Sequence, residues 1–102
     1  MNQVEDQNFE TLSTREVAYL VTKKVAEHIP SFKPDVGFDP VHNMMDFDKL
    51  LEKMLKNGWL LDHHATGNEH DVTICGRGLP SSKYVSFSFA HAFCMATLYA
   101  LS

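Results

Sequence analysis

Apolar residues recur every three or four positions in two parts of the chain, a period typical of amphipathic helices. The first part spans residues 13–29, where Ser13 and Glu16 have the spacing of a capping box and Pro30 stops the helix. The second part spans residues 44–57 and is followed by a glycine, a common helix terminator. Both segments keep their charged residues away from the apolar stripe, so we expect two surface helices.

Strict alternation replaces the helical period in the middle of the chain and predicts a β-hairpin. Its strands are expected over residues 59–66 and 69–76, joined by the two-residue turn Gly67-Asn68. Alternation places a mainly apolar face toward the core and a mainly polar face on the other side. A third strand is expected over residues 84–87, and residues 35–38 could add a short edge strand.

The C-terminal stretch, residues 84–102, contains no Asp, Glu, Lys or Arg. Its residues 89–101 are predicted to form a helix that is apolar all round and too short to span a bilayer. Because one small sheet covers only one side of such a helix, we expect a second copy of the protein to cover the rest. The residues expected to form this core and subunit interface are Phe89, Phe93, Met95, Leu98, Tyr99 and Leu101.

These elements predict an α+β protein with a small antiparallel sheet, formed by the hairpin at 59–76 plus one or two short strands and packed with three helices. A chain of 102 residues is the size of one domain. We expect that domain to cover residues 13–102. Residues 1–12 are polar and acidic, and we expect a flexible tail there.

Composition excludes some classes of partner and compartment. The net charge is −4 and the nine basic residues are scattered, which argues against nucleic-acid binding. Cys75 and Cys94 lie in apolar or alternating segments and are expected to be reduced, as in a cytoplasm. The N-terminal residues lack the basic start and apolar run of a signal peptide, so a cytoplasmic location is expected, without membrane attachment.

Three parts of the chain resemble the phage ABA-sandwich domain, a family of small bacteriophage and prophage proteins. They are the second helix with its lead-in, DPVHNMMDFDKLLEKMLKNGW, the hairpin that follows it, and the closing helix AHAFCMATLYAL. The resemblance covers Glu16 to Leu101 and implies an α/β/α sandwich and a viral or prophage origin, with the bacterial host cytoplasm as the location. It implies no catalytic residues. Met95 and Tyr99 stand where the family usually carries basic residues, which favours an added interface here.

The polar face of the hairpin gives the candidates for catalysis. Asp62, His64 and Asp71 share this face, and the expected register places His64 opposite Asp71, as an oriented general base would be. A triad also needs a nucleophile, and the nearby Thr73 belongs to no known motif. Because a solvated strand face carries the same residue types, catalysis is not the favoured interpretation.

Neither a metal nor another cofactor is predicted. His63 and His70 fall diagonally across the hairpin, too few for a zinc site, and are interpreted as histidines at the rim of the core. Arg77 and Lys83 bracket a turn-rich loop and could hold an anionic ligand. The leading hypothesis is therefore a non-enzymatic, homo-oligomeric interaction module of phage type, a homodimer or larger, that could also bind another protein. A binder of a small anion or nucleotide at residues 77–83 is the alternative.

Overall fold

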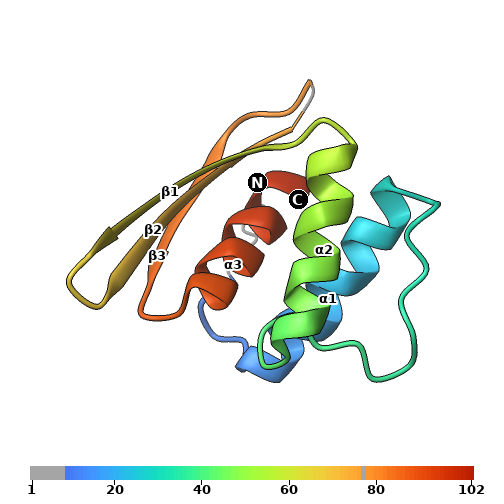
Figure 1. Ribbon diagram of the computed structural model, residues 1–102, viewed down its shortest axis with the longest axis horizontal. Helices are drawn as coiled ribbons and strands as arrows, with labels where there is room; N and C mark the ends of the chain where they lie inside the picture. Colours follow the sequence, from blue (N-terminus) through green and yellow to red (C-terminus); the bar gives the residue numbers. More distant parts are fainter. Residues whose placement is uncertain (1–8, 77) are drawn as a thin grey trace, which may run out of the picture.

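The computed structural model describes residues 9–76 and 78–102. Within these residues the chain forms three helices and a three-stranded antiparallel sheet with the strand order β1-β2-β3 (Figure 1). The elements follow one another as α1 (Thr14–His28), α2 (Met44–Lys56), β1 (Leu60–Thr66), β2 (Glu69–Cys75), β3 (Ser82–Ser86) and α3 (Phe89–Leu101). The predicted α+β class is confirmed, and so is the hairpin register, which pairs Thr66 with Glu69 and His64 with Asp71.

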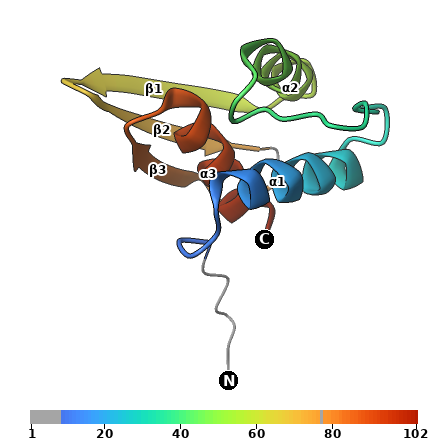
Figure 2. The ribbon, with the colours of Figure 1, turned by 90° about the horizontal axis from the view of Figure 1, so that it is seen from below.

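All three helices lie on the same side of the sheet (Figures 1 and 2). Helix α3 packs directly against the sheet, and α1 and α2 lie beyond it. The aromatic ring of Phe47 on α2 meets Phe93 of α3 edge to face, with centroids 5.4 Å apart. The opposite face of the sheet has no helix over it among the described residues, so the layers differ from the α/β/α sandwich that the family resemblance implies.

Helix α3 is covered by its own chain. Phe93, Met95 and Leu98 have relative exposures of 0%, 1% and 0% in a single copy. They have no surface left for a partner, and the expectation that these three residues form a subunit interface is wrong. The physical reason is that α1 and α2 pack on the side of α3 that faces away from the sheet. Phe89, Tyr99 and Leu101 are half-buried at the ends and edge of the helix.

The ordered domain reaches further toward the N-terminus than predicted. Phe9 is buried, and its ring lies edge-on to Tyr99 with the centroids 4.9 Å apart. The Glu10 carboxylate accepts hydrogen bonds from the hydroxyls of Tyr84 (2.8 Å) and Tyr99 (2.9 Å). Residues 9–12 are therefore tied to α3 and β3, which corrects this part of the predicted flexible tail. Residues 1–8 of that tail lie outside the described residues.

Local sequence signals explain where several elements begin and turn. Ser13 and Glu16 form the predicted capping box, and Asn43 and Ser88 cap α2 and α3 through their side chains. Gly76 follows β2 because a Cβ at this position would come within 2.6 Å of the Trp59 ring. The Gly76–Trp59 contact lies at the base of the hairpin, where β1 begins and β2 ends.

The predicted edge strand at residues 35–38 is wrong. The chain turns there instead, because Gly37 has a φ of 86° and the Phe38 N–H donates to the Asp35 carbonyl oxygen over 3.1 Å. Among the described residues, no helix has the length and apolarity needed to cross a membrane.

Candidate functional site

The open face of the sheet carries the residues that the sequence singles out for catalysis. Asp62 and His64 are 69% and 71% exposed at the side chain, and Asp62 Oδ1 lies 3.4 Å from His64 Nε2. Asp71, which the register places opposite His64, instead contacts the Lys83 ammonium group at 3.2 Å. The three candidates thus share a face, but two point into open solvent and the third is held by a lysine.

The predicted anion site does not form a cluster among the described residues. Lys83 lies on the open face of β3, where its charge is balanced by Asp71. Arg77 lies outside the described residues. Besides Lys83, this face carries the carboxylates of Asp62, Glu69 and Asp71, so it is acidic in balance.

Strand β1 is an edge strand whose outer side is free. It pairs with β2 only, and neither view shows another described element along its other side (Figures 1 and 2). Its burial pattern is exposed at every position except Leu61. The strand therefore offers a row of unpaired backbone N–H and C=O groups.

The hairpin register tells which backbone groups of β1 face outward. Thr66 and Glu69 close a two-residue turn, so they form a hydrogen-bonded pair. Hydrogen-bonded and non-hydrogen-bonded pairs alternate along an antiparallel ladder. The backbone groups of residues 60, 62, 64 and 66 therefore point to β2, whereas those of Leu61, His63 and Ala65 point to the free edge.

Two histidines contact each other on the helix side of the hairpin. His63 Nε2 and His70 Nδ1 are 2.9 Å apart, so the two imidazoles share a hydrogen bond. The ring of Phe89, the first residue of α3, stacks on His63 with the centroids 4.0 Å apart and the planes within 8°. The diagonal placement is as predicted, but the hydrogen-bonded partner of each histidine is the other histidine.

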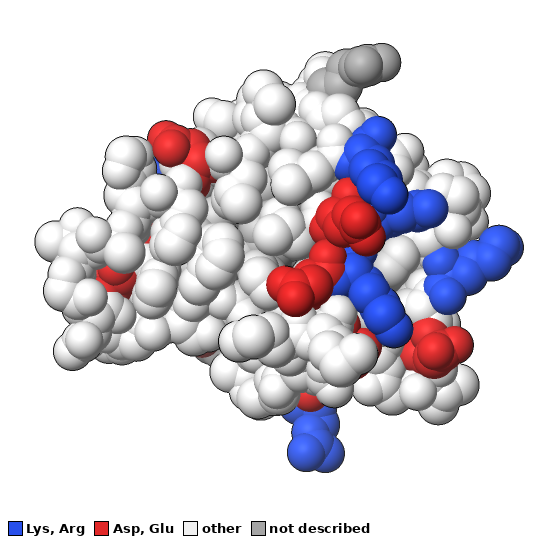
Figure 3. Space-filling model, viewed as in Figure 1, with Lys and Arg blue, Asp and Glu red and all other residues white. Residues whose placement is uncertain are grey.

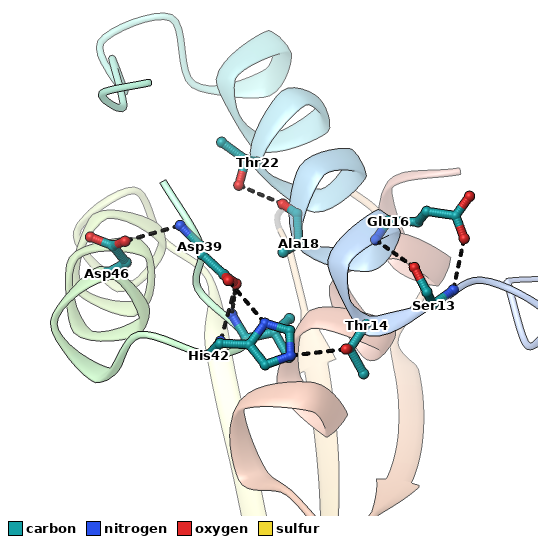
Figure 4. A network of polar contacts seen from close by, with 9 residues as sticks. Ser13, Thr14, Glu16, Ala18, Thr22, Asp39, His42 and Asp46 are labelled. Atoms are coloured by element: carbon teal, nitrogen blue, oxygen red, sulfur yellow. Dashed lines mark hydrogen bonds and ion pairs between the residues drawn. The ribbon is translucent and has the colours of Figure 1, made fainter. Parts of the chain in front are cut away.

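A third histidine forms a network that the sequence did not reveal. His42 Nδ1 contacts Asp39 Oδ2, and its Nε2 contacts Thr14 Oγ1, both at 2.9 Å (Figure 4). The other carboxylate oxygen of Asp39 accepts the backbone N–H groups of Val41 and His42, which hold the turn. These hydrogen bonds lower the pKa of Asp39, although burial acts in the opposite direction and is the largest single influence.

This network has the contacts of a nucleophile, a base and an orienting carboxylate. A hollow of about 270 Å³ lies beside His42 between the first turns of α2 and α3, but Thr14 does not line it. The hydroxyl therefore does not face the place where a substrate would bind. We interpret the network as a structural link from the 39–42 turn to the first turn of α1. The Asp39-x-x-His42 spacing was the available signal for the turn.

Basic residues gather around a different hollow from the one predicted. It measures about 240 Å³ and is lined by Lys33, Lys49 and Lys53, with Phe32 and Phe38 among the other lining residues. Figure 3 shows basic side chains over α2 and the loop beside it, close to acidic ones. Among the described residues, none of these three lysines has a carboxylate within 4.0 Å. The signal in the sequence was the pair of lysines four residues apart on α2.

Comparison with known protein families, with curated proteins and with solved structures gives no significant match for this chain.

Proposed function

We propose that this protein is a small interaction module that self-associates through the free edge of β1. The observation that carries the proposal is the outward row of backbone groups at Leu61, His63 and Ala65. An added antiparallel strand would pair these groups and extend the sheet without moving any helix. The phage or prophage origin that the resemblance implies stays a prediction and carries none of this argument.

The two edges of the sheet differ in protection. In natural proteins, lysine, proline, β-bulges or a short length commonly protect an edge strand of a sheet from pairing with another chain. Strand β3 has five residues and carries Lys83. Strand β1 has seven residues, contains neither lysine nor proline, and keeps an unbroken register with β2. The unprotected edge is therefore β1, which favours it as the site of pairing.

The sequence of β1 is complementary to itself. In an antiparallel pair of two copies centred on His63, Asp62 of each copy lies opposite His64 of the other. These are non-hydrogen-bonded positions, where facing side chains come closest, with Cα atoms about 4.5 Å apart. Centring the pair on Asp62 would oppose two carboxylates, and centring it on His64 would oppose two histidines without forming any Asp62–His64 pair. The register centred on His63 also opposes two histidines, the His63 side chains, but it alone forms two Asp62–His64 pairs. Charge complementarity therefore favours this register and a second copy as the partner.

The first test is sedimentation equilibrium in a buffer that contains a chelator. We expect a reversible dimer for the wild-type protein. Ala65→Pro removes an outward N–H group at a position where an edge strand tolerates proline, so it should give monomers with an unchanged circular dichroism spectrum. A wild-type protein that is monomeric at every concentration, or a folded Ala65→Pro variant that dimerises normally, would contradict the proposal.

A charge-exchange series tests the register. Each cross-strand pair is worth ~0.2–1 kcal/mol, and the dyad repeats it, so Asp62→His or His64→Asp alone should weaken dimerisation about 2- to 30-fold. The double variant Asp62→His/His64→Asp restores opposite charges and should recover the wild-type constant. If the double variant is as weak as the singles, the register is wrong.

The hollow beside α2 supports a second candidate function. Within the described part of the chain, Lys33, Lys49 and Lys53 have no ion-pair partner, and they lie beside Phe32 and Phe38. This lining suits a small anionic compound with an apolar or aromatic part. Phenyl phosphate and inorganic phosphate are suitable probes, with binding followed by backbone amide NMR shifts. Lys49→Gln/Lys53→Gln should abolish the shifts, whereas the matched change Lys23→Gln/Lys24→Gln on α1 should not. Equal effects of both double variants would show non-specific charge attraction and contradict a site.

A further inference from the structure

The His63–His70 pair has a property that self-association does not use. Two imidazole nitrogens, His63 Nε2 and His70 Nδ1, are brought within 2.9 Å from adjacent strands at the exposed rim of the hairpin. Imidazole nitrogen is a preferred ligand of Zn²⁺, Cu²⁺ and Ni²⁺. We propose that these two nitrogens bind one divalent transition-metal ion per chain.

The distance between the nitrogens fits chelation. Zinc binds histidine nitrogen at about 2.0–2.1 Å, so two tetrahedral ligands lie about 3.4 Å apart. An ion can therefore bind both nitrogens after they move apart by about 0.5 Å. The ring that donates the shared hydrogen bond then carries its proton on its other nitrogen, so both imidazoles bind in the neutral form. Both side chains are at or near the surface, since His63 is exposed and His70 is half-buried. An ion can reach them without opening the core.

The neighbouring ring of Phe89 restricts the position of the pair. It stacks on His63 at 4.0 Å and lies 6.1 Å from His70, and it is itself held edge-on by Phe47 at 5.2 Å. The register of β1 and β2 fixes the two backbones. Most of the conformational entropy of bringing two ligands together is therefore lost on folding rather than on metal binding.

The ligand count defines the kind of site. Among the described residues no group of three or more His, Cys, Asp and Glu side chains is placed to hold a metal. With two protein ligands, the ion keeps its other positions for water or a small exogenous ligand. This is an open site, unlike a structural zinc site, whose four positions are filled by the protein.

Zinc chloride is the probe for this site, and the readouts are calorimetric stoichiometry and the thermal midpoint. We expect one Zn²⁺ per chain and a midpoint that rises with zinc concentration, because the ion binds only the folded arrangement. His63→Gln and His70→Gln should each weaken binding about tenfold or more and remove the rise in midpoint. Magnesium chloride should produce neither effect, because Mg²⁺ requires oxygen ligands.

The matched control is His28→Gln. It removes an exposed histidine at the end of α1, outside the hairpin and outside the proposed dimer interface. Zinc binding by His28→Gln should equal that of the wild type. No zinc binding, binding that survives both His63→Gln and His70→Gln, or an equal loss in His28→Gln would each overturn the proposal. Because the self-association test uses a chelator, its outcome is independent of these results.

Discussion

Helix α3 and strand β1 lie in the same small domain, but they differ in how far the rest of the chain covers their side chains and pairs their backbone groups. Helix α3 has no charged residue, and the chain buries eight of its residues by itself. Strand β1 exposes almost every side chain, and the outward backbone groups of Leu61, His63 and Ala65 have no strand to pair with among the described residues. Apolar composition thus shows which segment is covered, but not which chain covers it. The free backbone edge of β1 is the place that we propose for a partner.

The largest change in stability is expected for a substitution in the buried helix α3. Phe93 is fully buried and meets Phe47 of α2, so Phe93→Ala leaves a cavity and should lower the free energy of unfolding by ~3–5 kcal/mol. Chemical denaturation measures this loss. If the mutated protein remains folded, its dimerisation constant should be unchanged. A destabilisation below about 1 kcal/mol, or selective loss of the dimer, would place Phe93 at an interface after all.

A smaller effect of the opposite sign concerns Thr97. Its hydroxyl is fully buried in α3, and it has no hydrogen-bond partner among the described residues. A buried unsatisfied hydroxyl costs about 1–3 kcal/mol, so Thr97→Val should raise the free energy of unfolding by about 1 kcal/mol. Urea denaturation with Thr22→Val as the comparison checks this, because the Thr22 hydroxyl donates to the Ala18 carbonyl oxygen. Destabilisation by Thr97→Val would show that the hydroxyl has a partner.

His91 gives a pH-dependent effect at the start of α3. Burial lowers its pKa below the ordinary value of 6.5, against an opposing influence of Glu10, and its Nδ1 bonds to Ser86 Oγ at 2.9 Å. On acidification the unfolded chain therefore takes up the proton before the folded one, so stability is present above pH 6.5 and is lost as pH falls toward the lower folded pKa. The urea midpoint should fall between about pH 8 and about pH 5.5, and His91→Gln should reduce that fall. An identical fall in both proteins would contradict the assignment.

The smallest effect is expected on the open face at β1. Leu60 is 69% exposed there, so Leu60→Thr removes little buried area and should change the free energy of unfolding by less than about 0.5 kcal/mol. The same thermal and urea measurements apply. A larger loss would show that this face is covered within the single chain.

The local elements could be predicted from the sequence, and the long-range contacts could not. Capping residues and alternation gave α1, α2, the hairpin register and α3, because these depend on residues close in sequence. The covering of α3 depends on the packing of α1, which no local pattern encodes. For the same reason the sequence did not predict that Phe9 packs on Tyr99 or that Glu10 bonds to Tyr84 and Tyr99. These contacts join residues far apart in the chain.

The candidate sites follow the same division. The sequence placed His63 and His70 as diagonal neighbours, but the 2.9 Å contact between their nitrogens needed the side-chain conformations. It also placed Asp62, His64 and Asp71 on one face, but not the pairing of Asp71 with Lys83. The link from His42 to Thr14 spans two elements and was missed.

Amide hydrogen exchange at low and high protein concentration tests the central claim most directly. The account predicts that protection of the Leu61, His63 and Ala65 amides rises with concentration, as each acquires an acceptor on a second copy. The buried amide of Phe93 in α3 should be equally protected at both concentrations. A protein that dimerises while those three amides stay unprotected, or while the added protection falls on α3, would contradict the account.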